Sequence, residues 1–293
     1  MAQKVGFIGL GAIGRPMAVH VARTFDTMVW NRTAEKATSF GQEHGAEVAS
    51  DLADLVAWSD VVMTCLPTSA EVKDLVKRVD GAWRNGQLLV DTTSGDPTTS
   101  REIADWLHER GVSFVDAPVS GGTDGAAEGR LTVMLGGDEA NVERAKKVIA
   151  PFSKTVKHVG PVGAGHALKA VNQALLAINI QVAGEGLAAL VKLGVNPQTA
   201  LDVINAASGR SNVTENLIPQ RVITRAWPRT FRLSLLDKDV GIALKLMQDT
   251  DVPHKNVEIT KEAFAAARAA LGEEADHVEF VKEVERAAGV EIK

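Results

Sequence analysis

Cysteine is almost absent from this chain, which has only Cys65 among its 293 residues. A single thiol excludes a disulfide framework and a thiolate zinc site, and within its apolar run Cys65 is expected to be a small buried hydrophobe. The seven histidines are scattered, so no metal site is expected. The net charge is −5 and no basic cluster stands out, which argues against a nucleic-acid partner.

Targeting and membrane-spanning patterns are also missing. The N-terminus passes directly into the apolar run Lys4–Leu10 without a basic region or a cleavage site, so we expect no signal peptide. No stretch approaches the ~20 apolar residues of a membrane span, because the longest candidate contains Asn179, Gln181 and Glu185. With 45% apolar and 24% charged residues, the composition is typical of a soluble globular protein. We expect it in the cytoplasm, with no membrane partner.

Short β-rich runs alternate with helical patterns through residues 4–160, and this alternation predicts a Rossmann-type doubly wound sheet covered by helices on both faces. The strands are expected at residues 5–10, 27–30, 60–65, 88–91, 114–117, 132–135 and 156–159. Helices are expected at 15–23, 34–43, 70–79, 98–109 and 139–149. The short spacing before the 132–135 strand indicates that the far edge of the sheet is not purely parallel.

The pattern changes at about residues 160–165. From His166 to Leu193 the sequence predicts one helix of roughly 28 residues, ended by Gly194. Further helices are expected at 197–207, 235–248, 256–271 and 277–288. We therefore expect a dinucleotide-binding domain over residues 1–162 and an all-helical domain over 163–293, joined through the long helix.

A glycine-rich turn follows the first strand and opens a helix. Its residues are Gly9, Leu10, Gly11, Ala12, Ile13 and Gly14. In this strand–turn–helix setting the glycines allow a tight turn, close approach to a pyrophosphate and close helix–strand packing. The phosphates then face backbone N–H groups at the helix N-terminus.

The second strand ends in Asn31-Arg32-Thr33, where an NAD-binding domain would carry a carboxylate for the ribose diol. Arg32 can instead make a forked contact with a 2′-phosphate, with Thr33 and Lys36 nearby. The alternative is that Arg32 is a solvated turn residue. We favour NADP, with NAD possible.

The start of the long helix carries Lys169, followed by Asn172 and Gln173 at spacings that share a helix face. Its surroundings are otherwise rich in alanine, and burial of a lysine lowers its pKa and lets it exchange a proton near neutral pH. The alternative is a solvated lysine near a helix N-terminus.

Five motifs in order resemble the β-hydroxyacid dehydrogenase family, most closely its bacterial-type 3-hydroxyisobutyrate dehydrogenases. They are Gly9-Leu-Gly-Ala-Ile-Gly14, Cys65-Leu-Pro-Thr-Ser69, Asp116-Ala-Pro-Val-Ser-Gly-Gly122, Gly163-Ala-Gly-His-Ala-Leu-Lys169 and Leu236-Asp-Lys-Asp239. The resemblance implies oxidation of 3-hydroxyisobutyrate to methylmalonate semialdehyde with NAD(P), a step of valine catabolism.

The resemblance also implies the roles of individual residues. Lys169 would be the catalytic acid/base, and Ser120, Gly121 and Gly122 would bind the substrate carboxylate in a small anion nest. The turn residues Leu66, Pro67 and Thr68, together with Thr93, would line the nicotinamide end of the cofactor cleft, since ligands bind at the carboxyl ends of strands. Lys238 would reach over the cofactor from the helical domain. The alternative is that Lys238 is a solvated charge at a helix end. For the nest residues, the alternative is an ordinary turn between a strand and a loop.

One departure concerns the position four residues after the lysine, where the family usually has asparagine and this chain has Gln173. Gln173 would still help to hold the lysine or the substrate. Arg210 is a candidate second carboxylate anchor, with a solvated loop arginine as the favoured alternative. We expect the substrate to be a small hydroxy acid; the alternative is that the enzyme is a reductase of tartronate semialdehyde, succinic semialdehyde or glyoxylate. A non-catalytic NADP-binding sensor is the alternative from another class. We expect a homo-oligomer that packs through residues beyond 165.

Overall fold

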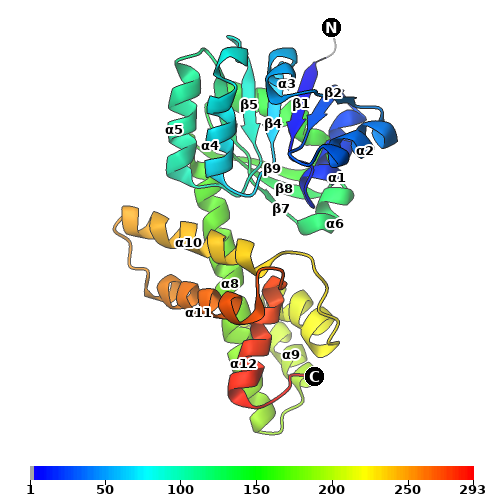
Figure 1. The fold of residues 1–293 in the computed structure, drawn as a ribbon. Coiled ribbons are helices and arrows are strands. Elements are labelled where there is room, and N and C mark those ends of the chain that lie inside the picture. The colour runs from blue at the N-terminus through cyan, green and yellow to red at the C-terminus, as the bar shows by residue number, and fades with distance from the viewer. Residues whose placement is uncertain (1–2) are drawn as a thin grey trace. The chain divides into compact units, whose positions relative to one another are not determined.

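The computed structural model describes residues 3–293, and the chain divides into two compact units, Met1–Lys169 and Ala170–Lys293. Figure 1 shows the elements along the chain. The strands are β1 (Lys4–Ile8), β2 (Asp26–Trp30), β3 (Glu47–Val48), β4 (Val61–Thr64), β5 (Leu88–Asp91), β6 (Ser113–Asp116), β7 (Val119–Ser120), β8 (Leu131–Gly136) and β9 (Ser153–Gly160). The helices before residue 164 are α1 (Gly14–Ala22), α2 (Ala34–His44), α3 (Leu52–Trp58), α4 (Ser69–Arg78), η1 (Asp80–Ala82), α5 (Pro97–His108), α6 (Gly122–Ala127), α7 (Glu139–Ile149) and η2 (Ala150–Phe152).

The sheet has the strand order expected of a dinucleotide-binding fold. Its strands run in the order β3-β2-β1-β4-β5-β6-β8-β7, with β9 paired to β8. The first six are parallel, and their order reverses between β1 and β4, where such folds bind ligands. The β6–β8 and β7–β8 pairs are antiparallel, which confirms the predicted mixed edge.

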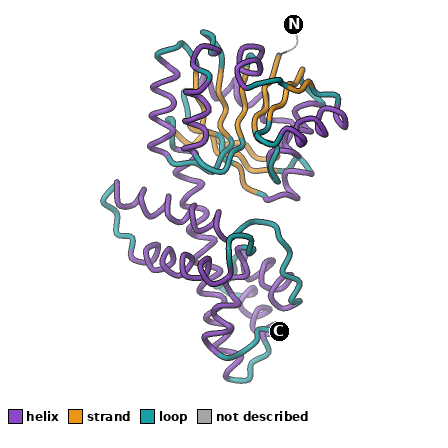
Figure 2. The backbone as a smooth tube through the Cα atoms, in the orientation of Figure 1, coloured by secondary structure: helices purple, strands orange, loops and turns teal. Residues whose placement is uncertain are grey.

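Alternating side chains along the parallel strands bury both faces of the sheet, as a doubly covered sheet requires. In β4, Val61 and Met63 join the hydrophobic cluster that includes Met17 and Val21 of α1. The residue between them, Val62, joins the cluster on the other face, which includes residues of α3, α4 and α5. Figure 2 shows strands between helices in this unit. The predicted fold class is confirmed.

The remaining helices begin with the long helix α8. They are α8 (Ala164–Lys192), α9 (Pro197–Ala206), the π-helical segment η3 (Val213–Ile223), α10 (Leu233–Asp249), α11 (Lys255–Leu271), η4 (His277–Glu279) and α12 (Phe280–Ala288). In the second unit they share a hydrophobic core of their own that includes Ile180, Leu236, Phe264 and Val281. Phe264 and Phe280 stack with ring centroids 4.4 Å apart.

Helix α8 corrects one expectation from the sequence. Among residues 3–293 it is the one helix long and apolar enough to cross a membrane, with a mean hydropathy of 1.7 over its most apolar window, 33% of which is buried. The expectation that no segment approaches a membrane span was therefore wrong for length and composition. Core helices of soluble proteins satisfy the same criterion, so it is weak evidence for a membrane.

Candidate active site

The glycine turn after β1 is built for close approach of backbone segments. Gly9 has a φ of +103°, which favours glycine, and a Cβ there would overlap the carbonyl oxygen of Cys65. A Cβ on Gly14 would overlap the carbonyl oxygen of Gly9. A Cβ on Gly11, in contrast, would meet no atom of the described residues within 4 Å, so this side of the turn has room for a bound group. The turn therefore fits a pyrophosphate at the N-terminus of α1.

The end of β2 is tied to this turn by Asn31. The backbone N–H of Leu10 donates to Asn31 Oδ1 at 2.9 Å, and Asn31 Nδ2 donates to the carbonyl of Thr33 at 2.9 Å. The side chain of Arg32 is 86% exposed, with Nη1 3.7 Å from Glu71 Oε1. The side chain of Asn31 thus holds the loop after β2 against the glycine turn. The exposed side chain of Arg32 remains accessible to a ligand.

The turns after β4 and β5 contact each other. Thr93 Oγ1 accepts from the backbone N–H of Leu66 at 3.1 Å, so the two predicted segments are held together. Thr68 caps α4 by accepting from the N–H of Glu71 at 3.3 Å. Burial raises the pKa of the Cys65 thiol to about 12, so the thiol is not a nucleophile at neutral pH. Cys65 is half-buried and packs against the hydrophobic cluster that includes Met17, so it is a packing residue as expected but is not fully buried.

The nest residues follow β6 through a short strand. Ser120 lies in β7, opposite Thr132 of β8, and Gly121 and Gly122 have φ values of +136° and +66°. A Cβ on Gly122 would meet no atom within 4 Å. Successive backbone N–H groups in such a turn form a concave site for an anion.

Lys169 lies in the second turn of α8 and is 7% exposed. The first turn of α8 is capped from a distant strand, because the carboxylate of Asp116 accepts from the N–H of Gly163 at 2.7 Å and from the N–H of His166 at 2.9 Å. Burial raises the pKa of Asp116, although His166 and these two N–H groups partly oppose the shift. The negative cap offsets the positive end of the helix, near which a lysine charge is unfavourable.

No role was assigned from the sequence to Asp91, Asp116 or His166, although Asp116 and His166 lie within two of the motifs. All three side chains are fully buried. Asp91 and Asp116 are register partners at the carboxyl ends of β5 and β6. In the sequence, the only sign of Asp91 and Asp116 is that each ends a short apolar run, the runs that form β5 and β6. Asp91 Oδ1 accepts from Thr64 Oγ1 at 2.8 Å and from the N–H of Thr93 at 3.1 Å.

The second unit places the other predicted polar residues on α8 and α10. Gln173 is 4% exposed, and its Nε2 donates to Asp239 Oδ2 at 3.1 Å. Lys238 Nζ lies 3.0 Å from Asp239 Oδ1. Asn172 is exposed, whereas Lys169 and Gln173 are buried. The three residues were predicted to share one helix face, and only Lys169 and Gln173 do so. The roles assigned to Gln173 and Lys238 stay predictions.

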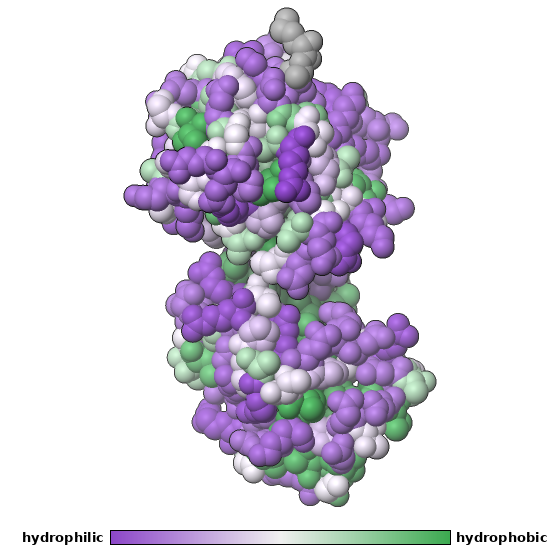
Figure 3. Space-filling model, turned by 90° about the vertical axis from the view of Figure 1, so that its right-hand side faces the viewer, coloured by the Kyte–Doolittle hydropathy of each residue, from purple (hydrophilic) through white to green (hydrophobic). Residues whose placement is uncertain are grey.

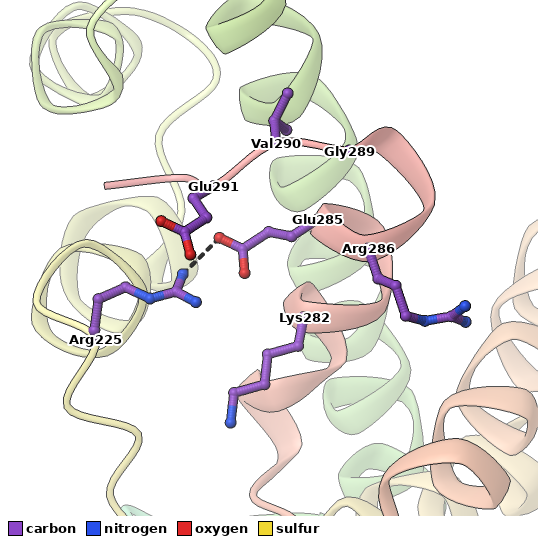
Figure 4. A pocket seen from close by; sticks show the side chains of 7 residues that line it. All are labelled: Arg225, Lys282, Glu285, Arg286, Gly289, Val290 and Glu291. Carbon is purple, nitrogen blue, oxygen red and sulfur yellow. Dashed lines mark hydrogen bonds and ion pairs between the residues drawn. The ribbon is translucent and has the colours of Figure 1, made fainter.

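Two further features lie in the second unit, and the candidate role of Arg210 stays a prediction. Arg210 Nε lies 3.3 Å from Glu215 Oε2 in the second unit, and its side chain is 62% exposed. Figure 4 shows a pocket in the same unit in which Arg225 points toward Glu285, its ion-pair partner at 2.6 Å. Within residues 3–293, no group of three or more His, Cys, Asp or Glu side chains is arranged to hold a metal ion.

Comparison with known proteins matches both halves of the chain. Residues 4–160 match the NAD-binding domain of 6-phosphogluconate dehydrogenase, and residues 163–284 match the NAD-binding domain of NADP-dependent 3-hydroxyisobutyrate dehydrogenase. The chain is 35% identical to 2-(hydroxymethyl)glutarate dehydrogenase of Eubacterium barkeri, covering 99% of this chain and 97% of that protein. It is 31% identical to 2-hydroxy-3-oxopropionate reductase of Escherichia coli, covering 96% and 97%.

A solved structure extends the similarity. The 3-hydroxyisobutyrate dehydrogenase of Mycobacterium tuberculosis with L-serine has a TM-score of 0.90 and 28% identity, covering 97% of this chain and 99% of that chain. The predicted nicotinamide cofactor, NADP or NAD, is confirmed by the two domain matches. The chain belongs to the β-hydroxyacid dehydrogenase family and is an NAD(P)-dependent dehydrogenase.

Proposed function

We propose that this enzyme transfers a hydride between NADP and a small β-hydroxy acid, and that 3-hydroxyisobutyrate, giving methylmalonate semialdehyde, is its substrate. One observation carries the proposal. Asp116 caps the helix turn before Lys169 and, four residues later, the same chain segment enters the nest at Ser120. The proposed proton-exchanging side chain and carboxylate site are therefore both attached to one short segment of chain, from the end of β6 to the glycines after β7.

Each group has a part in the proposed reaction. The backbone N–H groups of Gly121 and Gly122 and the hydroxyl of Ser120 bind the substrate carboxylate. Lys169 Nζ donates a proton to the carbonyl oxygen during reduction and accepts one from the hydroxyl during oxidation, which contributes about 10²–10⁴-fold in rate. Burial of Lys169 limits the access of water to this exchange.

The cofactor would be held by groups already described. The glycine turn from Gly9 to Gly14 fits the pyrophosphate, and Arg32 would bind the 2′-phosphate with Thr33 and Lys36 nearby. Leu66, Pro67, Thr68 and Thr93 would line the nicotinamide end. When bound, the nicotinamide supplies or accepts the hydride.

Related substrates and a different class of function are the competing proposals. Two relatives are named for a hydroxymethylglutarate and a 2-hydroxy-3-oxopropionate. The test therefore includes glyoxylate and the reduced forms of tartronate semialdehyde and succinic semialdehyde, which are glycerate and 4-hydroxybutyrate. A non-catalytic NADP sensor would have no use for Lys169 and the nest together. We also propose a cytoplasmic homo-oligomer.

The experiment is a panel of 3-hydroxyisobutyrate, 3-hydroxypropionate, glycerate, 4-hydroxybutyrate, L-serine and glyoxylate, each assayed with NADP and with NAD. The highest kcat/KM is expected for 3-hydroxyisobutyrate with NADP. A higher value for another acid reassigns the substrate. Binding of NADPH without turnover of any hydroxy acid or semialdehyde would support the sensor.

A further inference from the structure

A buried polar cluster lies directly behind the start of α8. It consists of Asp91 at the end of β5, Ser100 on α5 and His166 in the first turn of α8, all fully buried. His166 Nδ1 is 2.6 Å from Ser100 Oγ, and His166 Nε2 is 4.0 Å from Asp91 Oδ2. Among residues 3–293, Nε2 and Oδ2 have no hydrogen-bond partner. Buried polar atoms are normally paired.

Three glycines make the space that this cluster and the adjacent Asp116 occupy. A Cβ on Gly95 would lie 2.7 Å from His166 Cε1, and a Cβ on Gly165 would lie 2.7 Å from Asp116 Oδ2. A Cβ on Gly136 would overlap the carboxylate of Asp116. Separate segments of the first unit thus leave room for an imidazole and a carboxylate at the base of α8.

The cluster has the residue types of a Ser-His-Asp triad, but it cannot act as one. Ser100 has no exposed surface, whereas a nucleophile must reach its substrate. The energy of the cluster depends instead on which nitrogen of the His166 imidazole carries the proton. With the proton on Nδ1, a nitrogen lone pair would face the Asp91 carboxylate in a buried environment, and two acceptors facing each other there are unfavourable.

The repulsion at Asp91 favours the other tautomer, and the hydrogen bonds of Ser100 are compatible with it. The single hydroxyl proton of Ser100 can go to the carbonyl oxygen of Asp96 at 2.9 Å or to His166 Nδ1 at 2.6 Å. When it goes to Nδ1, the imidazole proton lies on Nε2 and faces Asp91. The charged groups around the imidazole are then Asp91, Asp116 and, three residues along the helix, Lys169.

We propose that His166 is a positioning residue for Lys169: its Nδ1 accepts from Ser100 and its Nε2–H is directed at Asp91. The side chain fixes the rotation of the first turn of α8 against β5 and α5. His166 and Lys169 are three residues apart and share a helix face, so this rotation determines where the lysine points. The catalytic consequence rests on the proposed acid/base function of Lys169.

The tautomer is tested by ¹⁵N NMR of histidine-labelled protein at neutral pH, with the His166 signals assigned from their loss in His166→Gln. We expect a protonated Nε2 and an unprotonated Nδ1. In Asp91→Asn, Oδ1 can keep both of its contacts while an amide N–H₂ faces His166, so the proton should move to Nδ1. A proton on Nδ1 in the unsubstituted protein, or no change in Asp91→Asn, overturns the tautomer.

The positioning role is tested by the ¹³C resonance of the Lys169 side chain, assigned from its loss in Lys169→Arg. It should shift in His166→Leu and return toward its original position in His166→Gln, which restores a donor near the site of Nε2. The control is His277→Leu in the second unit, a buried histidine that also neighbours an aspartate. It should lower the Tm without moving the Lys169 signal. An unmoved signal in His166→Leu overturns the role.

Kinetics give a separate outcome. His166→Leu should lower kcat about 10²-fold, since small misplacements of a reacting group have such effects. The Kd for NADPH should change less than about twofold, because its proposed anchors lie elsewhere, and a two-fold change is only a few tenths of a kcal/mol. A normal kcat in His166→Leu overturns the proposal. An inactive unsubstituted enzyme would instead refute the proposed function, while the NMR results would still decide the role of His166.

Discussion

Leu10 and Asn31 are joined by a hydrogen bond from the backbone N–H of Leu10 to Asn31 Oδ1, 2.9 Å long. This bond connects the glycine turn after β1 with the loop after β2, although the two residues are 21 positions apart. The next residue along the chain is Arg32, so its backbone is placed beside the proposed pyrophosphate site while its side chain stays exposed. The geometry favours a ligand that extends from one loop to the other.

The cofactor prediction concerns Arg32→Asp. Loss of a charge-assisted contact to a 2′-phosphate should cost about 1.5–3 kcal/mol, or about 10- to 150-fold in KM for NADP. The KM for NAD should change much less. Steady-state kinetics with both cofactors measure this, with Arg78→Asp, an exposed residue on α4, as the control for net charge. Equal effects on both cofactors would contradict the assignment.

The acid/base prediction concerns Lys169. Lys169→Ala should lower kcat by about 10²–10⁴-fold, while NADPH binding, followed by its fluorescence, is retained. Lys169→Arg should also be nearly inactive, because a guanidinium keeps the charge and does not release its proton. Lys192→Arg at the other end of α8 is the matched control. Substantial kcat in Lys169→Arg, with the defect mainly in KM, would show that the lysine is an electrostatic anchor.

The pH prediction concerns Asp276 in the second unit. Burial alone would raise its pKa, but His277 and the N–H groups of Phe231 and Thr230 outweigh that effect and hold the pKa well below its usual range. A carboxyl with a lowered pKa in the folded state stabilises the fold above its unfolded pKa, and this contribution is lost as the pH falls below about 5.

The measurement is urea unfolding of the unsubstituted protein and Asp276→Asn across the acid range. Removing the charge should lower the free energy of unfolding at neutral pH by about 1–3 kcal/mol. The two curves should converge in acid, because protonated Asp276 also lacks the charge. Parallel curves with a constant separation would mean that the ionisation of Asp276 does not contribute.

The oligomer prediction concerns an apolar stripe on α8, formed by Leu168, Leu175 and Val182, which are 43%, 57% and 58% exposed. They are seven residues apart and so lie along one side of the helix. Figure 3 shows apolar side chains among polar ones in one view of the surface. Val182→Glu should lower the mass measured by light scattering at micromolar concentration, whereas Val203→Glu on α9, 65% exposed, should not. A monomeric mass for the unsubstituted protein would rule out this interface.

The sequence predicted the long elements well and missed the short ones. Strands of two residues such as β3 and β7 have no measurable periodicity. Helix α3 has seven residues, and its start was marked by Asp51, whose side chain accepts from the N–H of Asp54. The π-helical segment Val213–Ile223 contains Pro219, which in a sequence indicates the end of a helix.

A candidate site could be proposed from the sequence where one stretch of chain carries the signal. Contacts between distant segments could not be predicted, and the roles of the site residues stay predictions. The glycine turn, the nest and Lys169 are each contained in a short motif. The cap on α8 joins Asp116 to Gly163 and His166, which are 47 and 50 positions away. No local pattern indicates such a pairing, and the aspartates resemble ordinary strand ends. The hydrogen bond from Gln173 to Asp239 is hidden for the same reason.

The cap also determines where this enzyme can be recombined with its relatives. A crossover between residues 162 and 163, the boundary expected from the sequence, would take Asp116 from one parent and the helix start whose N–H groups it accepts from, at Gly163 and His166, from the other. The first residues of α8, through Lys169, group with the sheet and not with the helices that follow. Chimeras that exchange the helical part of two family members should therefore keep the helix start with its own strand and cross over after Lys169.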